Sequence, residues 1–407
     1  MALRDAVVDL SPLRAAPLYR RLWIGQTFSG LGAQMTLVAV LYQVWTATGS
    51  AIWTGAVGLA QAIPLMAFGL FAGALVDRHD RRMFYLVATV GQAVCSVVLA
   101  VQAFFWHLPV LGVLGIVAVQ AAFGAVRGPA ARTFLSRLLP PEQLAAGLAL
   151  SRISFQGAML LGPSLGGLAL AAWGVGGCYL VDALTFLVAL YGAFGLPTMR
   201  PEGEPGRPGL HGILDGLAFL VRAPVVRGAL LTDLAATLFA MPISLFPLVN
   251  AEKFDNDPRT LGLFLSAIAV GGVAASVLSG TFTRRGRPGV VMLVGAFGWG
   301  IALTAFGAMT NPWLGLACLV VAGAADTVTV VSRSTVIQLH TPNALLGRVA
   351  AAEQIVGQGG PEIGNLRGGL VAGATSGTVA LVSGGLACVL VVTLVTAITP
   401  GLRRFRV

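Results

Sequence analysis

Apolar runs alternate with short polar turns along the whole chain. A helix needs about 20 mostly apolar residues to cross the hydrocarbon core of a bilayer, and the runs have this length, whereas the alternating ten-residue strands of an outer-membrane barrel are not seen. We therefore predict an all-α integral membrane protein with twelve transmembrane helices, over residues 22–46, 52–76, 83–106, 109–134, 147–172, 176–196, 227–250, 260–283, 290–310, 313–336, 348–373 and 376–399.

The composition agrees with this pattern and argues against an enzyme. Hydrophobic residues make up 56% of the 407 positions and charged residues only 10%, whereas a soluble domain is about one quarter charged. The four cysteines are scattered, and the four histidines lie at span ends or in loops, without the spacing of a metal site or a catalytic set. We expect no metal, no cofactor other than a proton gradient, and no cleaved signal peptide.

The net charge of +10 follows the predicted membrane topology. Arginines gather in alternate turns, before the first span, between spans two and three, after span four, in the central loop and at the C-terminus, while the turns between them are nearly free of charge. Because basic residues mark cytoplasmic loops, both termini are predicted in the cytoplasm. The expected partners are therefore the lipid bilayer, a small-molecule substrate and protons, with no nucleic acid, and the expected state is a monomer.

The longest break between spans divides the chain into two halves. Residues 197–226 are predicted to form a cytoplasmic linker with an interfacial amphipathic helix, between a six-helix half at 1–196 and another at 227–407. A weak repeat supports the division, since Arg132 and Arg333 each lie at the end of an even-numbered span and each precede a proline by nine positions. Duplicated halves suggest a transporter with a central site.

The stretch GALVDRHDRR, between spans two and three, resembles the signature loop of the major facilitator superfamily. The resemblance implies a latch at the cytoplasmic gate. Glu353, near the inner end of its span, is expected to neutralise an arginine of this gate, such as Arg78 or Arg82. The alternative is plain anchoring by positive charge, although anchoring alone needs neither the glycine nor the aspartate. The residues assigned to this gate are Gly73, Asp77, Arg78, Arg81, Arg82 and Glu353.

The stretch AMLLGPSLGG on span five resembles a Gly-Pro-rich motif of exporters in the same superfamily, and ordinary small-residue packing is the alternative. Its residues are Gly162, Pro163, Gly166 and Gly167. Longer stretches, among them LYRRLWIGQTFSGLG, resemble the bacterial enterobactin-exporter branch. That branch implies the inner membrane and export of siderophores, with drug exporters that exchange for protons among its relatives.

Acids within the spans are candidates for carrying protons, because a charge at this depth costs about 2.5–3.5 kcal/mol and burial favours the neutral form of a carboxyl group. The family architecture implies that Asp233 and Asp326 face the cavity, with Arg127 as a partner, while Asp182 is structural. Glu362 is a third candidate because the glycines and proline before it weaken the helix. The alternative for each acid is a static ion pair.

Amides and aromatic rings near mid-span are candidates for the substrate cavity, with helix contacts or core packing as the alternatives. They are Gln34, Gln61, Gln120, Gln156, Gln358, Phe239 and Phe246. Such a lining fits a bulky, mostly neutral amphiphile. The predicted function is proton-coupled export of a siderophore or a drug by alternating access. The alternatives are a proton-coupled importer of a small metabolite and a non-transporting membrane sensor or scaffold.

Overall fold

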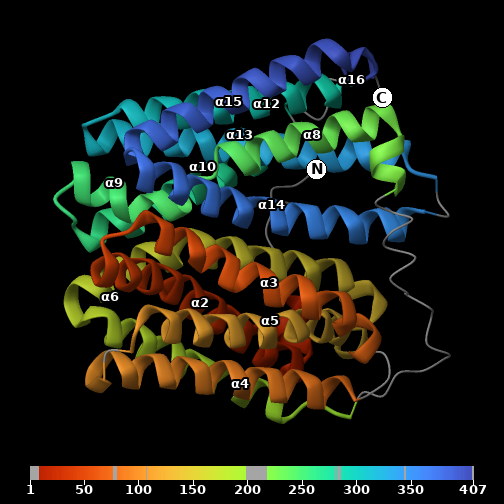
Figure 1. Ribbon diagram of the computed structural model, residues 1–407. Coiled ribbons are helices and arrows are strands. Elements are labelled where there is room, and N and C mark those ends of the chain that lie inside the picture. The colour runs from red at the N-terminus through yellow and green to blue at the C-terminus, as the bar shows by residue number, and fades with distance from the viewer. Residues whose placement is uncertain are drawn as a thin grey trace. The chain divides into compact units, whose positions relative to one another are not determined.

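The computed structural model describes residues 9–76, 80–106, 108–198, 218–279, 281, 286–342 and 345–405. Within these residues all regular structure is helical (Figure 1). Ten stretches are long and apolar enough to cross a membrane by length and composition, and the longest of them, Pro141–Phe194, contains both the fifth and the sixth predicted span. The sequence prediction of an all-α membrane protein is therefore confirmed.

Each of the twelve predicted spans falls on helical residues. The first six correspond to α2 (Pro17–Thr48), α3 (Ala51–Val76), α4 (Arg81–Val101) with a π-helical turn η2 (Gln102–Trp106), α5 (Val110–Leu138) and α6 (Leu144–Phe194). The others correspond to α8 (Pro224–Phe239) with η4 (Ile243–Leu245) and α9 (Phe246–Lys253), then α10 (Pro258–Val277), α12 (Pro288–Ala308), α13 (Pro312–His340), α14 (Leu346–Ala374) and α15 (Gly377–Ile398). Short helices α1 (Ser11–Ala15) and α16 (Pro400–Arg404) and the turn η3 (Pro141–Gln143) complete the set.

The helix starts follow from local sequence. Asp80 accepts a hydrogen bond from the Arg82 backbone at the start of α4, and Asn311 accepts one from Trp313 at the start of α13. A proline stands in the first turn of α8, α10, α12 and α13, where its missing N–H costs nothing. These signals fix where the apolar runs enter helical structure.

Two interruptions differ from the predicted spans. The fifth and sixth spans run as one helix, α6, whose backbone leaves helical angles at Gly174 (φ 68°, ψ −173°) and stays helical at Pro163. Span seven, predicted as one segment, is instead three pieces, because the chain leaves the helix after Phe239 and resumes through η4 and α9. Pro242 lies in that interruption and has no backbone N–H to continue the helix, while Pro247 lies in the first turn of α9, where a proline is tolerated.

The chain forms two compact units, which are described separately. The first unit comprises Met1–Val40 and Ile63–Gly206, and the second comprises Leu41–Ala62 and Arg207–Val407. The segment Leu41–Ala62 therefore belongs with the C-terminal part of the chain, which the sequence did not indicate. The predicted linker, 197–226, lies for the most part outside the described residues, and its boundaries stay a prediction.

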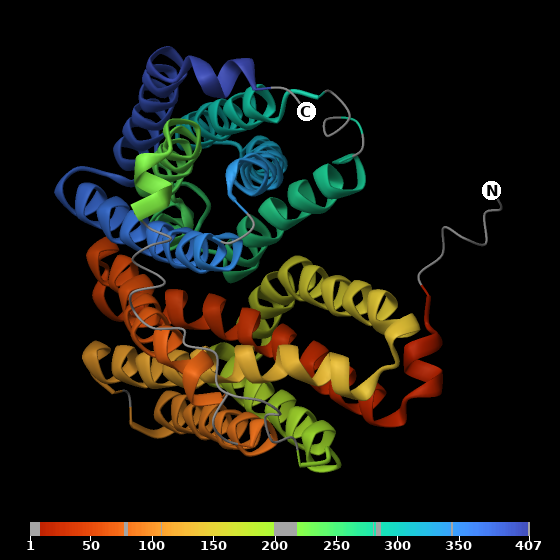
Figure 2. The ribbon, with the colours of Figure 1, turned by 90° about the vertical axis from the view of Figure 1, so that its right-hand side faces the viewer.

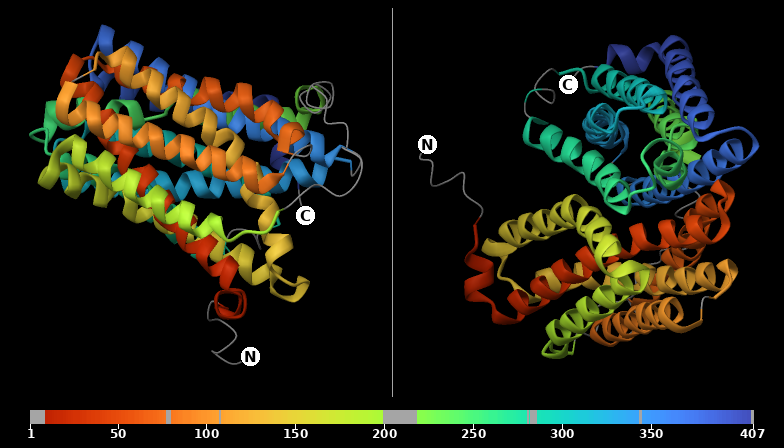
Figure 3. Two further views of the ribbon diagram at one scale, coloured as in Figure 1. Left: turned by 90° about the horizontal axis from the view of Figure 1, so that it is seen from below. Right: turned by 90° about the vertical axis from the view of Figure 1, so that its left-hand side faces the viewer.

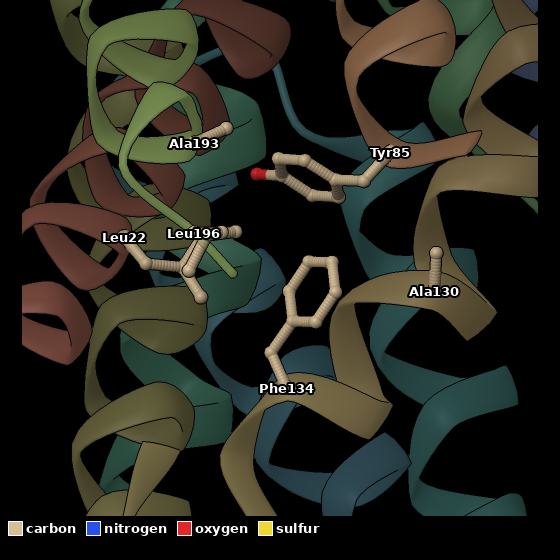
Figure 4. Packing of buried hydrophobic residues seen from close by; sticks show 6 residues of the cluster. All are labelled: Leu22, Tyr85, Ala130, Phe134, Ala193 and Leu196. Carbon is tan, nitrogen blue, oxygen red and sulfur yellow. The ribbon is translucent and has the colours of Figure 1, made fainter. Parts of the chain in front are cut away.

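In the first unit α4 packs against α5 and α6. Tyr85 of α4 meets Phe134 of α5 edge to face, with ring centroids 5.2 Å apart, inside a buried cluster with Leu22, Ala130, Ala193 and Leu196 (Figure 4). In the second unit α13 contacts α8, α10 and α12, and it is seen nearly end-on in Figure 2. The opposite view in Figure 3 shows the same arrangement. Polar groups on α13 are thus surrounded by other helices of the unit.

Candidate functional site

A buried arginine on α13 joins acids from two other helices of the second unit. The Arg333 guanidinium forms an ion pair with Asp233 of α8, and its Nε lies 3.2 Å from the Glu353 Oε1 of α14. Ser334 donates a second hydrogen bond to the same Glu353 oxygen, at 3.3 Å. Asp233 is 4% exposed and Arg333 is 8% exposed. Because removal of one partner leaves an uncompensated buried charge, this pairing holds three helices together.

Asp326 extends this group along α13. It lies two turns before Arg333 on the same helix, and the charges of both Asp233 and Arg333 act on it. The Glu353 charge also acts on Asp233. We call Asp233, Asp326, Arg333 and Glu353 the Arg333 cluster. Two carboxyl groups contact one guanidinium, and a third lies two turns away on α13, so full ionisation leaves an excess of negative charge that uptake of a proton would reduce.

The break in span seven lies beside α14, and side chains satisfy its free backbone groups. Arg367 donates from Nη1 to the Phe239 carbonyl at 2.8 Å, and its guanidinium lies 5.7 Å from the centre of the Phe239 ring. Asn365 accepts a hydrogen bond from the Ser244 N–H at 3.1 Å, while the Ser244 hydroxyl donates to the Asn365 carbonyl at 2.8 Å. Irregular backbone at membrane depth is tolerated where the protein supplies such partners.

Glu362 is part of the same polar contact. Its Oε2 accepts a hydrogen bond from the Asn365 amide at 3.1 Å and lies against Gly58 of α3. Thr54 of α3 donates to the Ser244 carbonyl at 2.8 Å. Glu362 is therefore linked by hydrogen bonds to the interrupted span through Asn365. We call the four residues of this set the Asn365 network: Thr54, Ser244, Glu362 and Asn365.

The expected weakening of the helix around Glu362 is wrong. Helix α14 runs from Leu346 to Ala374 with Pro361 inside it, and the interruption lies in the neighbouring span instead. The glycines before and after Glu362 serve close packing, because a Cβ at Gly360 would lie 2.7 Å from the Thr237 hydroxyl of α8, and one at Gly364 would collide with the Thr237 carbonyl. Small residues bring the two helices close enough for the side-chain contacts above.

Arg127 of the first unit has neutral partners. Its guanidinium donates to the Gln92 Oε1 at 3.0 Å and to the Ser29 hydroxyl at 2.6 Å. It also lies 5.5 Å from the ring centres of Tyr85 and Phe186, within the range of a cation–π interaction. The predicted partnership of Arg127 with Asp233 or Asp326 joins residues of different units, and it stays a prediction.

A cavity of about 420 Å³ opens beside Arg127 in the first unit. Of the residues predicted to face a substrate, Gln34 lines it together with Arg127. Its other polar lining comes from Gln26, Gln92, Ser151 and Ser154, and its apolar lining includes Trp23, Phe155 and Met159. Amides, hydroxyls and aromatic rings around one guanidinium suit an amphiphilic ligand with hydrogen-bonding groups.

Asp182 and Gln120 share hydrogen bonds elsewhere in the first unit. The Ser96 hydroxyl donates to Asp182 at 2.6 Å, and the Gln120 amide donates to the Ser96 oxygen at 2.9 Å and to Asp182 at 3.5 Å. Asp182 is 0% exposed. Gln120, predicted to line the cavity, is therefore bound to this structural acid, which is the helix contact that the sequence left open as its alternative.

The Gly-Pro stretch lies on α6 against α2. A Cβ at Gly162 would lie 2.5 Å from the Gln34 Cβ, and one at Gly166 would lie 2.9 Å from the Met35 Cα. Pro163 and Gly167 are buried on the same helix. Gly162 thus sets the position of Gln34, one of the residues that line the cavity.

The remaining predicted residues are placed as follows. Phe246 is fully buried and packs with Phe264 and Phe306, at centroid distances of 5.3 and 5.9 Å, so it is core packing rather than cavity surface. Gln61 and Gln156 are half-buried on α3 and α6. The side chain of Gln358 lies outside the described residues.

The gate residues are only partly described. Gly73 lies in α3, while Asp77 and Arg78 lie outside the described residues. Arg81 and Arg82 open α4, and Arg82 donates to the Phe194 carbonyl of α6 at 2.9 Å. The gate therefore stays a prediction. Glu353, which was assigned to it, is bound to Arg333 within its own unit.

Several functional residues were not found from the sequence. Each of them is a single neutral residue within an apolar run, and only its depth in a span distinguishes it from a surface residue. They are Ser29, Gln92, Ser244 and Asn365. For Asn365 a signal was present, since glycines at 360, 364 and 368 indicate one closely packed face of α14. Asn365 comes directly after Gly364 and lies beside that face.

Comparison with known proteins gives the family of the chain and several relatives. A model of the transmembrane secretion effector family matches residues 7–404. The chain is 29% identical to the enterobactin exporter EntS of Shigella flexneri and 28% identical to that of Escherichia coli O157:H7, over 98% of this chain and 96% of each relative.

Solved structures of other transporters share the fold. A nucleoside transporter, NupG, matches with a TM-score of 0.67 at 15% identity, over 95% of this chain and 98% of that one. A peptide transporter, POT, in complex with sulfate, matches with a TM-score of 0.75 at 13% identity, over 96% of both chains. At these identities the likeness concerns the fold alone.

Proposed function

We propose a function from the premise that this chain belongs to the transmembrane secretion effector family of the major facilitator superfamily, and is thus a membrane transporter. In this proposal it exports a bulky amphiphilic small molecule, a siderophore or a drug, in exchange for protons by alternating access. Relatives named as enterobactin exporters support the direction of transport and the class of substrate. The bacterial inner membrane, with both termini in the cytoplasm, is part of the same proposal.

The Arg333 cluster is the observation that carries proton coupling. Two carboxyl groups contact the Arg333 guanidinium and a third lies two turns along α13, so protonation of one acid gives Arg333 a different set of charged neighbours. The cluster joins α8, α13 and α14, so a change of partner alters contacts among three helices. Asp233 and Asp326 are the proposed proton carriers. Glu353 stays paired with Arg333 while one of them is protonated, and Glu362 contacts the interruption of span seven through Asn365.

The test is transport by Asp233→Asn and Asp326→Asn in proteoliposomes with an imposed proton gradient. Each variant should lose proton-driven export of the substrate while remaining folded, because asparagine keeps the size of the side chain but cannot take up a proton. Asp182→Asn is the control, since it removes a buried acid of the first unit outside the cluster. Full proton-driven transport by both cluster variants would overturn this assignment.

Direction and substrate need separate experiments. In inverted vesicles an exporter accumulates its substrate, whereas a proton-coupled importer depletes it, and a sensor or scaffold shows no substrate-dependent proton flux. Deleting the gene and profiling the medium under iron limitation should reveal a missing siderophore. Drug sensitivity of the same deletion strain tests the other class of substrate. A deletion strain with normal secretion and normal drug sensitivity would contradict the proposed substrates.

A further inference from the structure

A second hollow in the structure lies on the second unit, between α12 and α15. Its volume is about 710 Å³. Its walls are largely aliphatic, with Leu293 and Val392 buried at its base and Val294, Phe297 and Ile301 exposed along it. Val294 is 67% exposed and Ile301 is 51% exposed. Large apolar side chains exposed beside a continuous groove on membrane-spanning helices fit a hydrocarbon chain.

One end of this groove is positively charged. Arg287, directly before α12, and Arg403, on α16, both line the groove and are both exposed. They come to the same end because the Leu402 carbonyl lies against Gly289 in the first turn of α12. The described residues that line the groove include no acid. Two guanidinium groups therefore lie at one end of an apolar groove without a carboxylate among its lining residues.

The start of α12 adds to the attraction for an anion. Arg287 precedes this helix and makes no side-chain hydrogen bond to its first turn. The positive end of a helix of 21 residues favours a negative group placed beside it. A guanidinium offers two parallel donors, which match two oxygens of a phosphate. The three features together fit a phosphate with an apolar tail.

We propose that this groove binds an anionic phospholipid, with the phosphate between Arg287 and Arg403 and an acyl chain along α12 and α15. The occupant is a bilayer lipid because the groove lies along membrane-spanning helices and its charged groups are confined to one end. A neutral transport substrate would leave both arginines without a counter-charge. The site is distinct from the cavity beside Arg127 and from the Arg333 cluster, and the proposal does not depend on which molecule is exported.

The test measures lipid retained by the purified full-length protein, using native mass spectrometry with added dioleoyl phosphatidylglycerol or dioleoyl phosphatidylcholine. The wild type should retain phosphatidylglycerol preferentially, and Arg287→Gln/Arg403→Gln should lose this preference. Each arginine near a membrane surface strengthens attachment to anionic lipid by roughly fivefold, so affinity should fall by about thirtyfold. The control, Arg14→Gln/Arg20→Gln, removes two exposed arginines of the first unit and should retain lipid as the wild type does.

A second variant tests the apolar part of the site independently of charge. Thr393 is exposed in the groove and its hydroxyl donates only to the Val389 carbonyl of its own helix, so Thr393→Trp should fill the groove without unfolding α15. This variant should lose dioleoyl phosphatidylglycerol but keep any binding of inorganic phosphate. Unchanged lipid retention in Thr393→Trp, or in the double arginine variant, would overturn the proposal. Equal loss in the Arg14→Gln/Arg20→Gln control would also overturn it, because attachment would then be general surface charge.

Discussion

The two units place an arginine within their spans in opposite surroundings. Arg127 of the first unit is held by an amide, a hydroxyl and two aromatic rings, whereas Arg333 of the second unit is held by carboxylates. Asp182 of the first unit accepts hydrogen bonds from the neutral groups of Ser96 and Gln120, and the charge of Arg127 acts on it without a direct contact. Neutral partners keep a fixed charge in place, while several acids around one arginine allow the pairing to change. In the proposed function, the first unit supplies ligand contacts and the second supplies the charge that moves.

The largest effect should come from removing the arginine of the second unit. Arg333→Gln leaves the acids of the cluster without their counter-charge, and breaking a buried ion pair in this way costs about 3–5 kcal/mol of folding free energy. The matched change, Arg127→Gln, breaks hydrogen bonds to neutral groups and should cost about 1–3 kcal/mol. Thermal unfolding in one detergent measures both. Equal losses would remove the contrast between the units.

The same contrast predicts that Asp233→Asn recovers part of the stability that the second unit loses in Arg333→Gln. Asp233→Asn combined with Arg333→Gln removes both charges of the pair, so the double variant should be more stable than the sum of the single losses predicts. The coupling energy expected for groups in direct contact is about 0.5–3 kcal/mol. Unfolding of the two single variants and the double variant measures it. Strict additivity would show that Asp233 is not a partner of Arg333.

The Asn365 network tests how the second unit maintains an interrupted span. Asn365→Ala leaves the Ser244 N–H without its acceptor and removes the donor to Glu362, so we expect a loss of about 1–3 kcal/mol. Thr54→Val removes one hydrogen bond to the Ser244 carbonyl and should cost about 1 kcal/mol. Thermal unfolding compares the two variants, and hydrogen exchange at residues 240–245 should increase more in Asn365→Ala. Equal exchange in wild type and Asn365→Ala would show that the interruption does not depend on Asn365.

The sequence was sufficient for the features that repeat along the chain. Apolar length placed the predicted spans on helices, since a membrane imposes one length on every helix. The helix starts depend on caps and prolines that the apolar pattern does not contain. The two candidate acids Asp233 and Asp326 were found because a charge in a span is rare. Their position near Arg333 was only partly foreseen, because the contact of Asp233 with Arg333 joins positions 100 residues apart and depends on helix packing.

The apolar pattern did not predict the contacts of neutral polar residues or the places where helices are interrupted. Pro361 and Pro242 both lie within predicted spans, yet the helix continues through the first and ends before the second. The difference lies in the neighbours, since Asn365 and Arg367 satisfy the backbone around Pro242. Likewise Gln34 and Gln120 were equivalent predictions, and only packing places the first in a cavity and the second beside Asp182.

The last prediction concerns the close contact of α6 with α2 in the first unit. Gly166→Ala places a Cβ 2.9 Å from the Met35 Cα, and the helices must separate, which should cost about 1–3 kcal/mol. Gly157→Ala on the same helix is the control, because nothing lies within 4 Å of its added Cβ, and alanine favours the helix by up to about 1 kcal/mol. Unfolding of both variants measures the difference. If Gly166→Ala is as stable as Gly157→Ala, the glycines do not set the α2–α6 distance. Gly162 lies one turn before Gly166 on the same face of α6 and contacts Gln34. The close approach of α6 would then not explain the position of Gln34 in the cavity.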